Sequence, residues 1–224
     1  MSDGFLHRYF LANGRRTIHK WGHYFDIYER HFERFRGQSP TMLEIGVAGG
    51  GSLQMWKAYF GAGARIIGVD IRPECKQLEG EGIEVFVGSQ DDPALFDAIF
   101  AKYPKIDIVL DDGSHKMPHV MASFQLLYHR ISRDGVYMVE DLHTAYWDEF
   151  DGGYRREGTF IEHAKTLIDA INAAHIRDDA VPISDFTVST QSISIYDSII
   201  AFEKRPQGRR FAPITHAMGR EKPK

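Results

Sequence analysis

The sequence predicts an α/β fold, with a mostly parallel sheet that is covered by helices and closed by an antiparallel hairpin. Five short apolar runs, each followed by a stretch of helical length, occupy residues 41–47, 65–71, 83–88, 105–112 and 135–141. Near-continuous apolar strands that alternate with helices indicate a parallel sheet buried on both faces. The last two β-rich runs, 186–196 and 199–205, are joined by Asp197-Ser198, so we expect them to pair antiparallel.

Apolar and aromatic residues recur at helical spacing over 18–35, which predicts an amphipathic helix before the first strand. A second helix is expected over 160–174, after an aromatic, charged and glycine-bearing segment, 142–158, that is typical of a loop or lid. The predicted organisation is a loose N-terminal arm at 1–16, one domain at 17–205, and a basic tail at 206–224. The tail is expected to be mobile or to form a homo-oligomer contact.

The composition is that of a globular protein of one domain, with 224 residues, 43% of them hydrophobic and 26% charged. A formal net charge of −4 argues against a general nucleic-acid binder. The single cysteine, Cys75, cannot form an internal disulfide, which fits a reducing compartment. We find neither a signal peptide in the first residues nor an apolar run long enough for a membrane helix, and we expect a cytoplasmic protein without a membrane partner.

The first strand carries an acid and leads into a glycine-rich turn. Glu44 lies inside the strand, glycines follow from Gly46 onward, and Ser52 is a good capping residue for the next helix. Glycines let the backbone approach a ligand closely. The pattern loosely imitates a dinucleotide site, but an acid there would repel a pyrophosphate and instead suits the ammonium group of S-adenosylmethionine (SAM). Asp70 ends the second strand, where an acid binds ribose hydroxyls, although this residue alone does not separate SAM from NAD.

The third strand ends in GSQDDP at 88–93. In a nucleoside site, Gln90 or Asp91 at this position would accept a hydrogen bond from the adenine amino group. The same residues are also an ordinary signal for the start of a helix. Both interpretations stay open.

The fourth and fifth strands end in acidic pairs, Asp111-Asp112 and Glu140-Asp141, which should face one cleft. Four close carboxylates need a cation or raised pKa values, and Mg²⁺ (or Mn²⁺) prefers such oxygen ligands. We expect Asp112, Glu140 and Asp141 to be the metal ligands, with Asp111 turned toward the cofactor. The alternative is that Asp111 or Asp112 only caps the following helix.

His115 follows Asp112 by three residues and is the candidate general base for a hydroxyl whose pKa the metal lowers. His119 would share a helix face with it, which also suggests a zinc pair. Pro118 between the two histidines argues against that pair.

These motifs resemble the metal-dependent sugar O-methyltransferases of the mycinamicin and macrocin type, which are class I SAM-dependent methyltransferases with a Rossmann-like fold. The resemblance covers residues 17–205 and is carried by TIHKWGHYFDIYERHF (17–32), LEIGVAGGGSLQMW (43–56), IIGVDIRP (66–73), LDDGSH (110–115), VEDLHTAYW (139–147) and SISIYDSIIAFEK (192–204). It implies SAM as the cofactor, Mg²⁺ held by Asp112, Glu140 and Asp141, and His115 as the base.

The resemblance also implies that the segment with Lys20, His23 and Tyr24 closes over SAM. The acceptor would be a glycoside or another hydroxylated natural product, of the kind made in antibiotic biosynthesis. Residues His143, Tyr146 and Trp147 are the candidates for binding it. Three alternatives stay open: a catechol- or phenol-type O-methyltransferase, an enzyme related to cephalosporin hydroxylase-like sequences, and a SAM-binding protein without catalysis.

Overall fold

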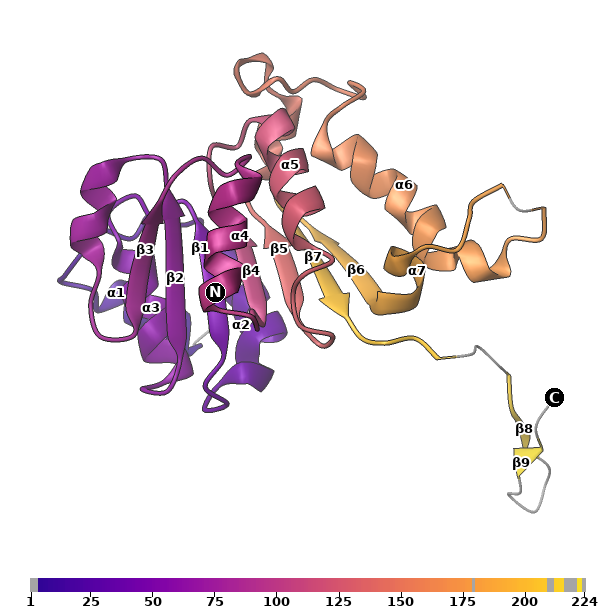
Figure 1. Ribbon diagram of the computed structural model, residues 1–224, viewed down its shortest axis with the longest axis horizontal. Coiled ribbons are helices and arrows are strands. Elements are labelled where there is room, and N and C mark those ends of the chain that lie inside the picture. The colour runs from indigo at the N-terminus through magenta and orange to yellow at the C-terminus, as the bar shows by residue number, and fades with distance from the viewer. Residues whose placement is uncertain (1–3, 179, 209–211, 216–220, 223–224) are drawn as a thin grey trace.

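The computed structural model describes residues 4–178, 180–208, 212–215 and 221–222. Its body is a seven-stranded sheet with the order β3-β2-β1-β4-β5-β7-β6 (Figure 1). The strands are β1 (Thr41–Ile45), β2 (Arg65–Asp70), β3 (Ile83–Val87), β4 (Ile108–Asp111), β5 (Val136–Val139), β6 (Thr190–Tyr196) and β7 (Ile199–Lys204). Strands β1 to β5 pair in parallel, whereas β7 is antiparallel to both β5 and β6. The predicted fold class is confirmed.

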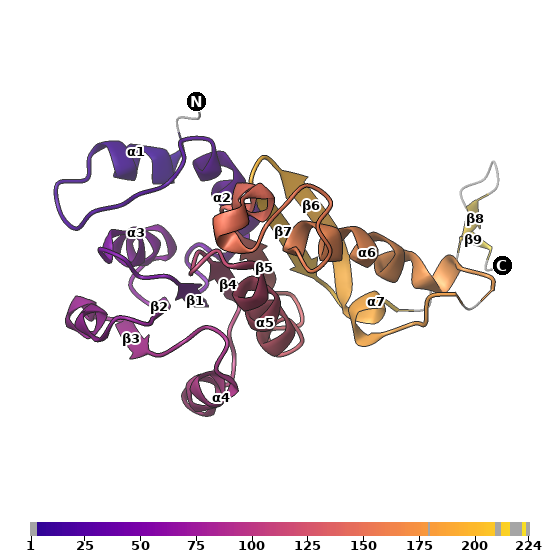
Figure 2. The same ribbon diagram turned by 90° about the horizontal axis from the view of Figure 1, so that it is seen from above.

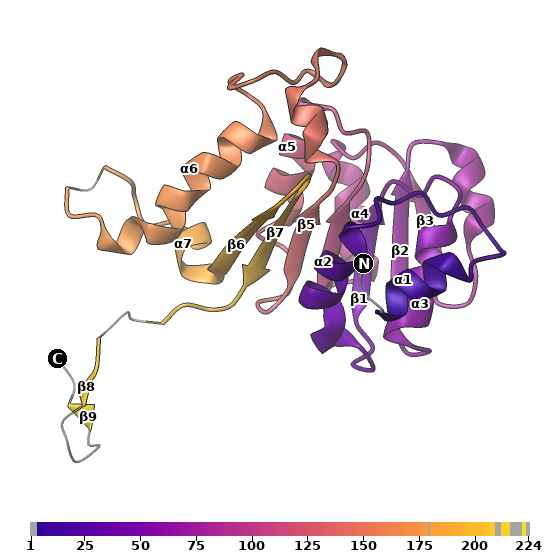
Figure 3. The same cartoon turned by 180° about the vertical axis from the view of Figure 1, so that it is seen from behind.

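Helices cover both faces of this sheet. Figures 2 and 3 show α1, α2 and α3 on one face, with α4 and α5 on the opposite face. Helix α6 packs beside α5, next to the closing hairpin. The helices are α1 (Phe5–Leu11), α2 (Tyr24–Phe32), α3 (Gly51–Phe60), α4 (Pro93–Lys102), α5 (Met117–Leu127), α6 (Phe160–Asn172) and α7 (Asp185–Ser189). Short 3-10 turns cover Glu33–Phe35, Pro73–Leu78, Leu142–Tyr146, Asp148–Phe150 and Ala173–His175.

The sheet separates two hydrophobic cores, and side chains alternate between them along the strands. On β1, Met42 packs with Trp56 and the helices α1 to α3, while Leu43 packs with Phe124 and the helices α4 to α6. All five residues of β1 are buried, as expected for a central parallel strand. Because β2 and β4 flank β1 on opposite sides, the order of the sheet reverses there, and ligands bind beyond the carboxyl ends at such a point.

The N-terminal region differs from the prediction in two places. Residues 5–11, expected to lie in a loose arm, form α1, whose Leu6 is fully buried in the core. The helix predicted over 18–35 begins only at Tyr24, so the prediction is wrong for residues 18–23. These residues run without helix or strand, and Trp21, which fits the apolar periodicity over 18–35, is 55% exposed.

The C-terminal region differs in one element. The strand predicted from residue 186 begins at Thr190, because Ser184 and Thr187 form a capping box that starts the short helix α7. Beyond β7, the predicted tail carries the two-residue pair β8 (Ile214–Thr215) and β9 (Glu221–Lys222). The prediction of a mobile or oligomer-forming tail concerns mostly residues 209–211, 216–220 and 223–224, which lie outside the described part of the chain.

Candidate active site

A cavity of about 420 Å³ lies beyond the carboxyl ends of β1, β2, β3, β4 and β5. The N-terminal segment before α2 forms one of its walls. The lining residues are 17–20, 45–49, Ser52, 69–72, 88–90, 112–115, His119 and Asp141. Of the predicted cofactor-binding residues, Lys20, Gly46, Ser52, Asp70 and Gln90 line this cavity.

The glycine turn after β1 brings the backbone close to the end of β4. Gly46 has a φ of +92°, and a Cβ atom at this position would lie 1.9 Å from the carbonyl oxygen of Asp112. Gly50, with a φ of +73°, precedes α3. Both positions suit glycine, which adopts positive φ without steric cost.

We expect Gly46→Ala to disrupt this end of the sheet. The added methyl would force apart the turn after β1 and the backbone of Asp112, at a cost of roughly 2 kcal/mol or more in unfolding free energy. Urea unfolding measures this loss. Gly14→Ala is the control, since a Cβ atom there has no neighbour within 4 Å among the described residues, and its stability should stay within about 0.5 kcal/mol of wild type. A urea midpoint of Gly46→Ala equal to that of wild type would contradict the close approach of Gly46 to the Asp112 backbone.

Glu44 and Ser52 form a buried pair beneath the cavity wall. Ser52 does not cap α3, because Gly50 holds the cap position; instead its hydroxyl donates to Glu44 Oε2 at 2.8 Å. Glu44 is fully buried, and its Oε1 has no hydrogen-bond partner among the described residues. Burial raises the pKa of Glu44, against the attraction of Lys20. Ser52 lines the cavity, whereas Glu44 lies behind it.

Asp70 connects the second strand to the glycine turn. Its Oδ2 accepts hydrogen bonds from the backbone N–H groups of Val47 and Ala48, at 3.0 and 3.1 Å. The Arg72 guanidinium binds both carboxylate oxygens at 3.1 Å. Burial alone would raise the pKa of Asp70, but these hydrogen bonds hold it well below its ordinary value. Asp70 is therefore a charged carboxylate on the cavity wall.

Gln90 and Asp111 belong to a buried polar network rather than to a free binding surface. The Gln90 amide oxygen accepts from Ser114 N at 2.7 Å, and its nitrogen donates to Asp111 at 3.2 Å and Ser123 at 3.1 Å. The amide oxygen predicted to bind adenine is thus already paired. The helix-start interpretation of this segment is confirmed, because Asp92 caps α4.

Asp111 is 1% exposed and does not line the cavity, so the prediction that it turns toward the cofactor is wrong in this structure. Ser123 and Tyr137 donate hydrogen bonds to it. Burial raises the pKa of Asp111 to about 6, with the Ser123 hydrogen bond acting in the opposite direction.

Asp112, His115 and Asp141 form a group whose candidate ligand atoms all lie within 4.8 Å of one another. His115 Nε2 lies 4.0 Å from Asp112 Oδ1 and 3.7 Å from Asp141 Oδ2. His115 and Asp141 have φ values of 59° and 53°, a strained conformation for non-glycine residues that is often found at functional sites. This group opens into the cavity that Gly46 and Asp70 line.

Glu140, the third predicted metal ligand, lies outside this group. Its Oε1 accepts from the Tyr28 hydroxyl at 2.7 Å and its Oε2 accepts from Lys20 Nζ at 2.9 Å, so both oxygens are paired. The side chain is buried, and burial raises its pKa well above the ordinary value, opposed by Lys20. Metal ligation by Glu140 is therefore not the arrangement seen in this structure.

Residues of the N-terminal segment donate hydrogen bonds to the carboxylates at the ends of β4 and β5. Lys20 Nζ also lies 2.6 Å from Asp112 Oδ2, and the Tyr24 hydroxyl donates to Asp141 Oδ1 at 2.7 Å. Tyr24 is fully buried, and His23 lies against its ring, 3.3 Å from the Asp197 carbonyl oxygen. Lys20 thus lines the cavity, whereas His23 and Tyr24 do not.

The predicted acceptor-binding residues lie beside the cavity rather than in its wall. Tyr146 and Trp147 are 49% and 45% exposed, and the ring of His143 lies 4.8 Å from Trp147. Ring contacts continue from Trp147 through Phe150 to His115, at centroid distances of 6.0 and 6.1 Å. An exposed aromatic surface therefore leads to the acid–histidine group.

Sequence reasoning missed several residues of the cavity wall, among them Arg72 and His119. His119 Nδ1 lies 2.9 Å from the Ser114 hydroxyl, and its Nε2 lies 3.8 Å from Asp91. His119 does not join the group of Asp112, His115 and Asp141, and its two ring nitrogens face Ser114 and Asp91 instead. Arg72 could have been suspected, since it is the basic residue two positions after Asp70.

No family model matches the chain. The chain is 38% identical over 202 residues to an 8-demethyl-8-alpha-L-rhamnosyl tetracenomycin-C 2'-O-methyltransferase of Streptomyces olivaceus, covering 85% of this chain and 53% of that protein. It is 38% identical to the demethylmacrocin O-methyltransferase of Streptomyces fradiae, over 72% of this chain and 44% of that protein. The mycinamicin VI 2''-O-methyltransferase of Micromonospora griseorubida is 40% identical, over 68% of this chain and 40% of that protein.

Among solved structures, the MycE methyltransferase of the mycinamycin biosynthetic pathway, in complex with Mg and SAH, matches with a TM-score of 0.78 and 33% identity. The match covers 90% of this chain and 54% of that one. A putative caffeoyl-CoA O-methyltransferase from Staphylococcus aureus, at 11% identity and a TM-score of 0.52, shares the fold alone. The chain spans about half the length of the curated relatives that it matches. Over that shared half, the chain belongs to the sugar O-methyltransferases of the mycinamicin and macrocin type.

Proposed function

We propose that the chain is a SAM- and Mg²⁺-dependent O-methyltransferase that methylates a hydroxyl group on the sugar of a glycosylated natural product. The observation that carries this proposal is the group of Asp112, His115 and Asp141, which opens into the same cavity as Gly46 and Asp70. One wall has the features of a nucleoside site and the other has the oxygen donors that Mg²⁺ prefers. The relatives named above are sugar O-methyltransferases, which supports the acceptor class.

The cavity wall fits SAM in three features. The turn at Gly46 gives close access to the backbone, and Asp70 offers a charged carboxylate for the ribose hydroxyls. The Oε1 atom of Glu44 is buried behind Ser52 and accepts no hydrogen bond among the described residues, and a carboxyl group there suits a ligand that carries an ammonium group. We assign these residues to the cofactor and withdraw Gln90 from adenine binding, because its amide is already paired.

The metal would be held by Asp112 and Asp141, and by Glu140 once Lys20 has released its Oε2 atom. When bound, it lowers the pKa of the acceptor hydroxyl. His115 accepts the proton of that hydroxyl at Nε2, the nitrogen that faces both carboxylates. The surrounding residues hold the hydroxyl oxygen in line with the methyl group of SAM, because positioning supplies much of the acceleration in such a transfer. Tyr146 and Trp147 are assigned to the acceptor, since their exposed rings suit the apolar faces of a sugar, and His143, whose ring packs against Trp147, is assigned to it with them.

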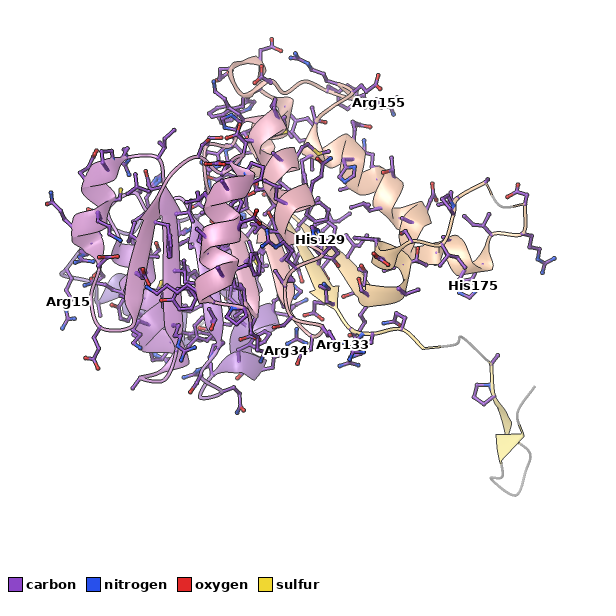
Figure 4. All side chains as sticks on the ribbon, viewed as in Figure 1. Arg15, Arg34, His129, Arg133, Arg155 and His175 are labelled. Atoms are coloured by element: carbon purple, nitrogen blue, oxygen red, sulfur yellow. The ribbon has the colours of Figure 1, made fainter. Side chains whose placement is uncertain are left out.

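The proposal also covers partners and location. The formal net charge of −4 supports the absence of a nucleic-acid partner. Among the labelled basic residues, Arg15 and Arg155 project from separate parts of the surface, whereas Arg34 and Arg133 lie near each other (Figure 4). Among the described residues, no helix is long and apolar enough to cross a membrane. A cytoplasmic location fits the free, buried Cys75. In this proposal residues 17–205 act as one methyltransferase domain. Any contact between copies of the chain is assigned to the tail at 206–224.

Calorimetric titration with S-adenosylhomocysteine (SAH) and NADH tests the assignment of the cofactor. SAH should bind and NADH should not. Asp70→Ala should weaken SAH binding by more than about tenfold, or roughly 1.4 kcal/mol, because it removes both a ribose ligand and the acceptor that holds Val47 and Ala48. Asp97→Ala, at an exposed aspartate on α4, serves as the control. Binding of NADH without SAH would overturn the proposal.

A further inference from the structure

Lys20 is a buried cation inside the acid cluster that the proposed function assigns to a metal. Its Nζ lies 2.6 Å from Asp112, 2.9 Å from Glu140 and 3.5 Å from Glu44, and the side chain is 3% exposed. Burial lowers the pKa of Lys20, but the three carboxylates more than offset this and raise it well above its ordinary value. The ammonium group is therefore charged and serves as the counter-ion of the cluster.

Lys20 and a metal would need the same oxygen atom of Glu140. Tyr28 holds Oε1 of this side chain and Lys20 holds Oε2, so neither oxygen is available to an ion while Lys20 stays in place. Asp112 shows the same competition in part, since its Oδ2 binds Lys20 while its Oδ1 faces His115. A divalent ion bound to Asp112, Glu140 and Asp141 would also repel an ammonium group at contact distance.

The surroundings of Lys20 allow it to leave without refolding the chain. The residue belongs to the irregular segment before α2 and already lines the cavity. A lysine side chain has a flexible four-carbon stem, so rotation about its bonds can carry the ammonium group from the acids into the cavity. Tyr24 and Tyr28, which belong to α2, can keep their hydrogen bonds to Asp141 and Glu140 during this movement.

We propose that Lys20 is an exchangeable internal cation, which holds Asp112 and Glu140 in place without metal and is displaced into the cavity when Mg²⁺ or Mn²⁺ binds. The inference rests on the proposed function, because it takes Glu140 as a metal ligand. Lys20 is a positioning residue in this account. The exchange of Lys20 for a metal ion explains why Glu140 is paired with a lysine in this structure and is also suited to bind a metal.

Two measurements with Mn²⁺ as the probe test the exchange. In the first, electron paramagnetic resonance counts free Mn²⁺ during a titration of wild type, Lys20→Met and Lys116→Met. Lys20→Met should bind Mn²⁺ about tenfold more tightly, because the competing cation is gone. Lys116 is an exposed lysine next to His115, outside the acid cluster. Lys116→Met removes the same charge but no cation from the cluster, so its Mn²⁺ affinity should stay within about twofold of wild type. Unchanged or weaker binding by folded Lys20→Met would contradict the exchange.

The second measurement uses the wild-type chain, so it does not depend on whether Lys20→Met folds. Acetic anhydride labels accessible lysines, and mass spectrometry of peptides reports the extent at each site. Saturating Mn²⁺ should raise the labelling of Lys20 about tenfold or more, as burial no longer protects it. Lys204, another buried lysine that donates to the Tyr128 and Ile131 carbonyl oxygens, should stay protected. Protection of Lys20 while Mn²⁺ is bound would overturn the exchange and leave the proposed metal site standing. Absence of Mn²⁺ binding would overturn both.

Discussion

Replacing His115 with alanine is expected to lower turnover by about 10²–10⁴-fold, the usual contribution of a positioned general base. The imidazole faces Asp112 and Asp141 on the side of the cavity where the acceptor would bind. SAH affinity should therefore change by less than about threefold. Initial rates with saturating SAM measure turnover, and calorimetry measures the affinity for SAH. His129→Ala, at an exposed histidine near the end of α5 (Figure 4), is the control and should keep wild-type turnover.

A competing role for His115 follows from its place in the candidate ligand group. If the imidazole binds the metal instead of the hydroxyl proton, His115→Ala should lose Mn²⁺ affinity, and high metal concentrations should restore turnover. A base that has been removed cannot be restored in this way. Recovery of near wild-type turnover at saturating metal would thus contradict the assignment of His115 as the base.

Removing the metal is expected to have an effect of similar size. A chelator should abolish turnover and added Mg²⁺ should restore it, because the metal supplies several kcal/mol of charge stabilisation, or roughly 10²-fold or more in rate. Asp141→Asn should reproduce this loss in a folded protein. Asparagine tolerates the left-handed backbone that Asp141 adopts at a φ of 53°, and its amide oxygen can still accept from Tyr24.

The matched control is Asp151→Asn. Asp151 has a φ of 61° and is exposed, so this variant makes the same chemical change in the same backbone conformation away from the acid group. SAH binding should be retained by both variants. Full turnover in excess chelator, after the metal content has been measured as zero, would exclude the proposed metal role.

The sheet could be predicted from the sequence because its signal is local. Each strand of the parallel part is a short apolar run, and the acids at 70, 111–112 and 140–141 mark where such runs end. The same patterns place Asp112, His115 and Asp141 at neighbouring strand ends, and in the structure these three residues are close together. Strand ends fix where the backbone places a residue, and this sufficed for Asp112 and Asp141.

The errors arise where distant partners decide the structure. Residues 18–23 have helical periodicity, but the insertion of Lys20 among Glu44, Asp112 and Glu140 is a contact across 24, 92 and 120 positions. The sequence predicts that Glu140 and Asp111 both face the cleft, yet Tyr28 and Ser123, on helices from opposite faces of the sheet, hold these carboxylates elsewhere. Spacing along the chain carries no information about which donor will reach a buried carboxylate.

The central claim is that this chain transfers a methyl group from SAM to a hydroxyl in the presence of Mg²⁺. The most direct measurement incubates the protein with SAM carrying a deuterated methyl group, Mg²⁺, and a panel of glycosides and phenols, and follows the products by mass spectrometry. The proposal predicts that a glycoside gains one deuterated methyl group on its sugar, and that neither a chelated sample nor the Asp141→Asn variant forms this product. Transfer to phenols without transfer to any glycoside would contradict the acceptor class. SAH binding without methyl transfer to any member of the panel would contradict the catalytic claim itself.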